Sequence, residues 1–186
     1  MITIENTPNP ATLKFQFNFQ LPMAAGHEMN SPSEAEISPL AAKIFGFPWT
    51  SKIYLGSDFI SVTKQEWVDW DVLAEPLKGL IQEHIDSGEP VLMDSLPLTP
   101  RGGSEEFDEK DAELVGKIKT ILSRDIRPIV AMDGGDIVFA KYADGIVFVR
   151  LQGSCSGCPS STATLKDGVE VRMKELLPEI LEVRTV

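Results

Sequence analysis

The chain has 186 residues, 42% of them hydrophobic, so it can bury one core or two small ones, and disorder throughout is excluded. Its 17 Lys and Arg residues face 28 Asp and Glu residues. The resulting net charge of −11 argues against nucleic acid or an anionic membrane as a partner, because proteins that bind phosphate groups usually carry a basic face. No run of about 20 apolar residues is present, so no membrane span is predicted.

The first part of the chain predicts strands and a short helix. Residues 13–19 alternate apolar and polar side chains, which is typical of a strand with one buried face. Residues 29–38 hold a proline and three serines and predict a loop. Ser38 and Pro39 then predict the start of a helix, because proline suits the first helical position.

A hairpin and a longer helix are expected next. Residues 53–55 and 59–62 are mostly apolar and flank a Gly-Ser-Asp turn, which is a hairpin signal. The helix is expected from about Pro76 to Ser87, since proline is poorly tolerated inside a helix. The three tryptophans are expected in packing positions.

Residues 94–106 predict a flexible linker. They include two prolines and two glycines and show neither a helical nor a strand period. We therefore expect two small domains, residues 1–93 and 107–186, each of the α+β class.

The C-terminal domain is expected to have the order α-β-β-α-β. Apolar residues repeat with helical spacing up to Ile126, and Arg127 and Pro128 are expected to end that first helix. The run of residues 133–136, Asp-Gly-Gly-Asp, predicts a tight turn into a hairpin, and a role in shaping the cysteine loop is the alternative. The elements expected afterwards are strands over residues 136–140 and 146–151, a helix over 165–177 and a strand over 181–186.

The two cysteines, Cys155 and Cys158, lie between a predicted strand and a predicted helix. Two intervening residues let both sulfurs face one metal ion or one cluster. Gly153 and Gly157 allow backbone turns that other residues disfavour. Pro159 suits the first turn of the helix, whose N-terminal partial positive charge would favour the thiolate that binds metal.

The number of ligands shapes the interpretation of this pair. A structural zinc site needs about four ligands and a [4Fe–4S] cluster takes four cysteines, whereas this chain offers two cysteines. His27, expected in a solvated loop, and His84, expected to be hydrogen-bonded, belong to the other domain and lack ligand spacing. The missing ligands would come from a second copy, a client or a small thiol, and a two-fold dimer supplies them most simply. Such a dithiol would be solvent-accessible, which suits transfer.

Three other interpretations of the cysteines stay open at this point. They could form an incidental disulfide or stay unligated, they could hold zinc in a structural role, or they could act as a dithiol oxidoreductase, since strand, C-x-x-C and helix is also the thioredoxin arrangement. Only 28 residues follow Cys158, too few for a thioredoxin-like fold. No conventional catalytic constellation is present, so we expect a protein that is not an enzyme.

Two stretches of the sequence carry a family resemblance. Residues 153–161, preceded by Met132 to Asp136, resemble the C-terminal domain of NifU, the Nfu-type domain, over roughly residues 107–182. Residues 1–90, with Thr-Pro-Asn-Pro at residues 7–10, resemble the N-terminal domain that often accompanies it.

The resemblance implies an iron–sulfur cluster scaffold or carrier. Cys155 and Cys158 would bind a [4Fe–4S] cluster shared by two subunits of a homodimer. The cluster would come from upstream assembly proteins and pass to apo-proteins such as enzymes of lipoate synthesis or aconitase, which the N-terminal domain would recognise. The expected location is a reducing bacterial cytoplasm, or the mitochondrial matrix for a processed eukaryotic form.

Overall fold

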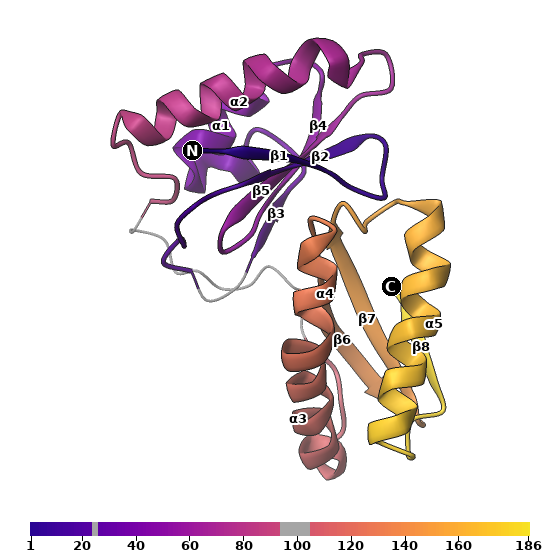
Figure 1. The fold of residues 1–186 in the computed structure, drawn as a ribbon. Helices are drawn as coiled ribbons and strands as arrows, with labels where there is room; N and C mark the ends of the chain where they lie inside the picture. The colour runs from indigo at the N-terminus through magenta and orange to yellow at the C-terminus, as the bar shows by residue number, and fades with distance from the viewer. Residues whose placement is uncertain (24–25, 94–104) are drawn as a thin grey trace. The chain divides into compact units, whose positions relative to one another are not determined.

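A computed structural model describes residues 1–23, 26–93 and 105–186, and gives only the backbone for residues 159–166. The chain divides into two compact units, Met1–Pro100 and Arg101–Val186 (Figure 1). Each unit combines helices with a sheet, so the predicted α+β class with two domains is confirmed. The exact bounds of domains and linker stay predictions, because residues 94–104 lie outside the described residues.

The N-terminal unit is an antiparallel sheet with two α-helices packed on it (Figure 1). Its strand order is β1-β2-β5-β4-β3. The elements are β1 (Thr3–Asn6), β2 (Thr12–Gln16), β3 (His27–Met29), the 3-10 helix η1 (Glu34–Ile37), α1 (Pro39–Phe45), β4 (Thr50–Leu55), β5 (Phe59–Lys64) and α2 (Trp70–Asp86).

Alternating side chains of the central strands form the core of this unit. Phe15 of β2 lies opposite Ile60 of β5, and both are completely buried. Ile53 of β4 is likewise completely buried, and Ile81 of α2 joins the same cluster. The alternation that predicted a strand from residue 13 therefore marks a real buried face, and the predicted hairpin is confirmed as β4 and β5.

Helix α2 begins six residues earlier than predicted and contains Pro76 in its interior. Trp70 and Ala74, in the turns before the proline, pack against the core, and this burial favours the longer helix. Pro76 cannot donate a hydrogen bond to the carbonyl of Val72. The Val72 side chain is 71% exposed, so this turn faces solvent, where water can hydrogen-bond the carbonyl.

The prediction of a solvated loop for His27 is wrong. His27 lies in β3, paired with Leu55 of β4, and its side chain is buried. The predicted loop over residues 29–38 also holds the end of this strand and the short helix η1. A three-residue strand is too short to show an alternating pattern, which is why the sequence did not indicate it.

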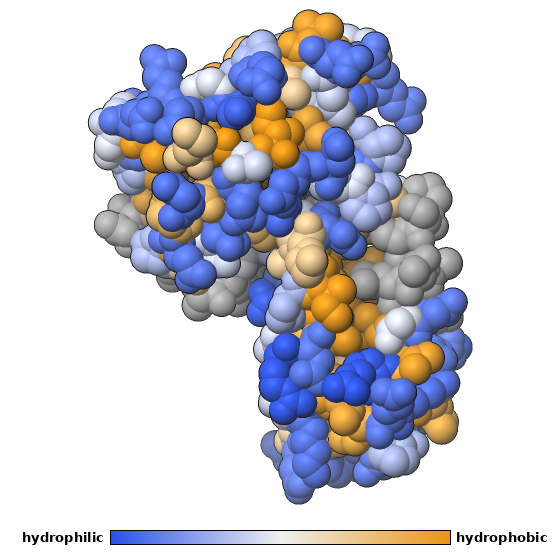
Figure 2. All heavy atoms as spheres, viewed as in Figure 1, coloured by the Kyte–Doolittle hydropathy of each residue, from blue (hydrophilic) through white to orange (hydrophobic). Residues whose placement is uncertain are grey.

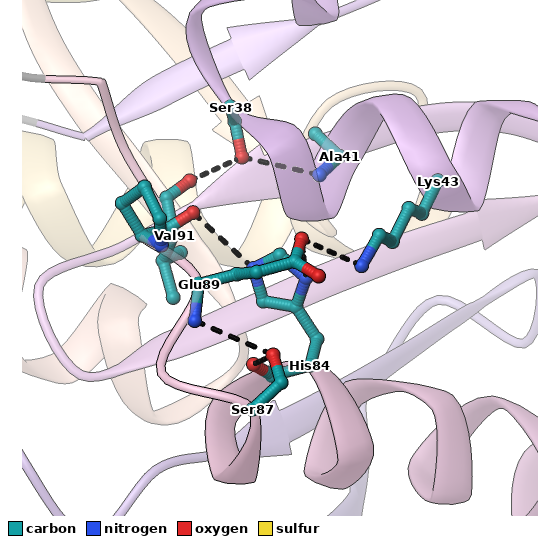
Figure 3. Close-up of polar contacts among 8 residues, drawn as sticks. Ser38, Ala41, Lys43, His84, Ser87, Glu89 and Val91 are labelled. Carbon is teal, nitrogen blue, oxygen red and sulfur yellow. Dashed lines mark hydrogen bonds and ion pairs between the residues drawn. The ribbon is translucent and has the colours of Figure 1, made fainter.

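Helix α1 begins as predicted, with Ser38 as its cap. The Ser38 hydroxyl oxygen accepts a hydrogen bond from the amide of Ala41 at 3.1 Å and donates one to the carbonyl of Val91 at 2.6 Å (Figure 3). Ser38 is completely buried. One side chain therefore both caps the helix and holds the segment that follows α2.

The same segment is held from α2 by His84. Its Nε2 lies 3.2 Å from the carbonyl oxygen of Pro90, and the neighbouring Glu89 accepts a hydrogen bond from Lys43 of α1 at 2.8 Å (Figure 3). The Lys43 ammonium lowers the pKa of the Glu89 carboxyl. The hydrogen-bonded position predicted for His84 is confirmed. We call the two hydrogen bonds from Ser38 and His84 to the backbone carbonyls of Val91 and Pro90 the clasp.

Replacing Ser38 should weaken this clasp. We expect Ser38→Ala to lower the free energy of unfolding by about 2 kcal/mol, because it removes a helix cap and leaves the buried Val91 carbonyl without its partner. Urea titration followed by circular dichroism measures the change. Ser57→Ala, at an exposed hairpin serine, should change the same quantity by less than about 0.5 kcal/mol, and equal losses would contradict the clasp.

The C-terminal unit has a sheet of order β6-β7-β8, with β6 and β7 antiparallel and β7 and β8 parallel. Helix α4 packs against β6 and helix α5 against β8 (Figure 1). The elements are the 3-10 helix η2 (Glu109–Asp111), α3 (Ala112–Ile121), the π segment η3 (Leu122–Ile126), α4 (Arg127–Met132), β6 (Gly135–Ala143), β7 (Ile146–Gly153), α5 (Pro159–Leu176) and β8 (Glu182–Thr185). The predicted order α-β-β-α-β is confirmed.

The first helical stretch of this unit does not end at Arg127 and Pro128, as predicted, but continues to Met132. A π segment, Leu122–Ile126, precedes the proline, and the Arg127 amide bonds the carbonyl of Leu122, five residues back. The wider π turn accommodates the proline, which cannot donate the usual helical bond. Leu122 and Ile126 are buried, so packing holds the segment in place.

Glu106, placed in the predicted linker, bonds to the C-terminal unit. Its amide donates to the carbonyl of Ala140 at 3.1 Å, and its carbonyl accepts from the amide of Tyr142 at 3.0 Å. The C-terminal unit therefore includes Glu106, the last residue of the predicted linker.

The distribution of hydrophilic and apolar side chains on the surface is consistent with two buried cores. Hydrophilic side chains dominate the face drawn in Figure 2, and apolar ones gather in patches between them, as is normal when most apolar residues are already inside. In the described part of the chain, no helix is long and apolar enough to cross a bilayer.

Candidate metal centre at the cysteine turn

The cysteines lie in a tight turn between β7 and α5, which we call the cysteine turn (residues 153–158). Gly153 and Gly157 have φ angles of 66° and 81°, a region that disfavours other residues, as the sequence predicted. The Ser156 amide closes the turn on the carbonyl of Gly153 at 3.2 Å. Cys158 is the N-cap residue of α5, so both cysteines stand at the start of that helix.

A second turn, from α4 into β6, forms a wall of the site. The amide of Ser154 bonds the carbonyl of Gly134 at 3.2 Å, and the Ser154 hydroxyl donates to the carbonyl of Asp133. Gly134 has a φ of 77°, so the tight turn predicted for residues 133–136 is confirmed. Pairing of Gly135 with Gly153 fixes the two turns beside each other.

Gly135 leaves room for the Cys155 sulfur. A methyl group added at Gly135 would lie 2.6 Å from Cys155 Sγ and 2.8 Å from the carbonyl oxygen of Gln152, both far inside van der Waals contact. The Gly-Gly run therefore shapes the cysteine loop as well as the turn, which was the alternative considered for it.

An ion pair that the sequence did not indicate braces this wall. Arg127 of α4 donates to both carboxylate oxygens of Asp136, at 2.7 and 2.6 Å. Asp136 is buried, and it also accepts from the amide of Ile137 at 2.8 Å. Nine residues separate the partners, and only the π segment with its following turn brings them together, so no local pattern could have revealed the pair.

Neither cysteine forms a disulfide, and both are buried, with exposed fractions of 3% for Cys155 and 1% for Cys158. The expectation of a solvent-accessible dithiol is therefore wrong for this single chain. Burial raises the pKa of the Cys155 thiol to about 11, the hydrogen bond between Cys155 and Ser154 lowers it, and the negative charges of Asp133, Cys158 and Asp136 raise it further. Desolvation thus outweighs the helix N-terminus that was expected to favour thiolate.

The described residues supply two thiol donors at this site. No group of three or more His, Cys, Asp and Glu side chains suited to a metal ion occurs in the described ranges. His27 and His84 are both buried within the N-terminal unit. Two thiolates can hold a soft metal or a cluster only with donors from elsewhere, and metal binding itself would remove their protons. The assignment of Cys155 and Cys158 as ligands stays a prediction.

Gly135→Ala tests the close approach. Because the added methyl must displace the Cys155 sulfur or the Gln152 carbonyl, we expect the free energy of unfolding to fall by about 1–3 kcal/mol. The matched control is Gly116→Ala in α3, where an added methyl meets nothing within 4 Å. That change should raise stability by about 0.5–1 kcal/mol, since alanine favours helix. Urea titration of both variants decides, and two equal shifts would contradict the steric argument.

Thiol alkylation tests the burial. In reduced, metal-free protein the Cys155 pKa of about 11 leaves little thiolate at pH 8, whereas an unfolded cysteine titrates near ~8.5. We expect iodoacetamide to modify native Cys155 on the order of a hundredfold more slowly than urea-unfolded Cys155 at pH 8. The native rate should climb about tenfold per pH unit up to about pH 10. Peptide mapping by mass spectrometry gives the rates, and a native rate that levels off near pH 8 would refute the raised pKa.

Comparison with known proteins agrees with the two-unit structure. The family model "Scaffold protein Nfu/NifU N terminal" matches residues 2–88, and the model "NifU-like domain" matches residues 118–184. Two similar curated proteins, from Drosophila ananassae and Drosophila persimilis, are both described as "NFU1 iron-sulfur cluster scaffold homolog, mitochondrial". They are 39% and 38% identical to this chain over its full length. The chain spans 64% of the length of each.

Solved structures match parts of the chain. An NMR structure of a NifU-like protein from Saccharomyces cerevisiae has a TM-score of 0.46 and 24% identity, covering 51% of this chain and 86% of that one. A crystal structure of a Staphylococcus aureus protein has a TM-score of 0.39 and 20% identity, covering 43% of this chain and 96% of that one. The two family models, matched in order along one chain, identify the protein as one that joins an Nfu/NifU N-terminal domain to a NifU-like domain.

Proposed function

We propose that this protein is a scaffold or carrier that holds a [4Fe–4S] cluster between two copies of the chain and delivers it to apo-proteins. Each copy would supply Cys155 and Cys158. The observation that carries the proposal is the half-complete donor set: two reduced cysteines in the turn before α5, with no group of three or more metal-binding side chains among the described residues. The description of the Drosophila relatives as iron–sulfur cluster scaffolds supports it.

The geometry suits a cargo that is held and then released. Cys158 is the N-cap of α5 and Cys155 precedes it by three residues, and the partial positive charge of the helix N-terminus would stabilise the Cys158 thiolate once metal has displaced its proton. Gly153 and Gly157 let the turn open toward a second copy, because glycine crosses between backbone regions without a steric penalty. A pair of donors from each side leaves the cluster at an interface, where incoming thiolates of a client can exchange for those of the carrier.

An oxidoreductase is the second candidate, and the acidity of Cys155 counts against it. The pKa of Cys155 is raised to about 11, while reactive dithiols of oxidoreductases have a lowered thiol pKa. We therefore propose ligand exchange at sulfur and no enzymatic turnover. Zinc at the same thiols is the remaining alternative.

Partners and location follow from this proposal. The partners would be a second copy of the chain, upstream cluster-assembly proteins and apo iron–sulfur proteins, with neither nucleic acid nor membrane among them. The relatives are described as mitochondrial, which favours the mitochondrial matrix over the bacterial cytoplasm, and the cytoplasmic location is a prediction that they do not support.

Anaerobic reconstitution with iron and sulfide tests the function. We expect a brown protein with broad absorbance near ~400 nm and about four irons per two chains, eluting as a dimer. Cys155→Ser and Cys158→Ser should each abolish the absorbance and the dimer, because each removes one ligand from both copies and so leaves two of the four. Gly116→Ala, outside the site, should reconstitute like the unaltered protein.

Three results would reject the proposal. A colourless protein with tightly bound zinc would assign a structural metal site, and reduction of insulin disulfides by the metal-free monomer would assign an oxidoreductase. A cluster retained by Cys155→Ser at the original iron content would show that other residues hold it.

A further inference from the structure

A hollow on the N-terminal unit lies between the edge strand β1 and the first turns of α2. Its volume is about 350 Å³, within the ~300–1,000 Å³ typical of ligand pockets. Ile4 of β1, Leu13 of β2, and Trp70 and Ala74 of α2 give it apolar walls. We call it the β1–α2 groove. Its lining residues all belong to the N-terminal unit, so the groove is separate from the cysteine turn.

One wall of the groove is a turn with a fixed shape. The residues 7–10, Thr-Pro-Asn-Pro, connect β1 to β2, and the Thr7 hydroxyl lies 2.9 Å from the carbonyl oxygens of both Asn9 and Thr12. The Asn9 side chain accepts from the amide of Ala11 at 3.0 Å. The groove is therefore built before any partner arrives, which lowers the entropy lost on binding. The motif marked the family resemblance, and the groove gives it a physical role.

The rim of the groove is acidic. Asp71 and Glu75, one helical turn apart on α2, line it and are exposed, and its lining contains neither lysine nor arginine. Glu75 lies 3.9 Å from Lys78, at the limit of an ion pair, whereas Asp71 has no ion-pair partner within the described ranges. A cationic side chain would be attracted here and an anionic one repelled.

The backbone of β1 also offers polar groups to a partner. Strand β1 is at the end of the sheet and pairs with β2 on one side, so its other edge can accept a further strand.

We propose that the β1–α2 groove binds an extended, basic segment of a partner protein. The segment would pair with β1, insert one large apolar side chain between Ile4 and Trp70, and place a lysine or arginine beside Asp71. Identifying this partner as a client that receives the cluster rests on the proposed function, whereas peptide binding itself does not.

Phage display of random decapeptides against the full-length chain is the direct test. We expect enriched sequences that combine a lysine or arginine with a large apolar residue. Synthetic fluorescent copies of these peptides would then be titrated by anisotropy. Asp71→Lys should raise their Kd at least tenfold, and Ala74→Phe should do the same by filling the groove. Higher salt should weaken binding, because exposed charges are screened.

Glu83→Lys is the matched control for Asp71→Lys. It makes the same change in charge at an exposed residue of α2, 12 residues and about 18 Å further along the helix, and it should leave Kd within twofold. Melting curves of all variants verify that they fold. Enriched peptides without a basic residue, no enrichment at all, or equal losses from Asp71→Lys and Glu83→Lys would each overturn the proposal.

The cysteine variant separates this proposal from the proposed function. Cys155→Ser should bind the peptides as the unaltered chain does, because the groove lies within the N-terminal unit. If the chain binds the peptides but never assembles a cluster, peptide binding in the groove is supported and the identification of the partner as a cluster client is rejected. If the chain assembles a cluster normally but binds no peptide, only the groove proposal is rejected.

Discussion

The position of the two cysteines depends on the contact between two backbone turns, the cysteine turn and the turn at residues 133–136. Ser154 bonds the carbonyls of Asp133 and Gly134 through its hydroxyl and its amide, and the bare backbone of Gly135 leaves the volume that the Cys155 sulfur fills. The sheet register, the brace from Arg127 and the start of α5 all hold these turns together. The fold of this unit therefore sets where the two thiols lie.

Burial of the thiols gives this arrangement a protective side. A neutral thiol is a poor nucleophile and is oxidised slowly, since the thiolate is the reactive form. With Cys155 and Cys158 almost fully covered, an empty carrier would be shielded from oxidation and stray metals. Under the proposed function, loading would require the turn to open and the protons to leave, and bonds from the thiolates of both copies to the metal would supply the free energy for both. The same covering would make cluster release and protection parts of one motion.

Sequence reasoning recovered features that depend on near neighbours in the chain. The cap at Ser38, the hairpins and the glycine turns around the cysteines depend on residues a few positions apart, and each is found where it was predicted. Features set by packing at a distance were missed: Pro76 inside α2, the burial of His27, and the pair of Arg127 with Asp136. The exposure of the cysteines was misjudged for the same reason, because the strands and helices that cover them come from the whole unit.

The π segment Leu122–Ile126 acts as an angular spacer in the helical stretch. Each residue of an α-helix advances the side-chain direction by about 100°, so one extra residue per turn resets the phase of all that follows. With this change of phase, Arg127 points toward Asp136, and α4 ends at the turn that begins at Asp133. A one-residue deletion in this segment would leave the helix content nearly unchanged while rotating the wall of the thiol site away from its sulfurs.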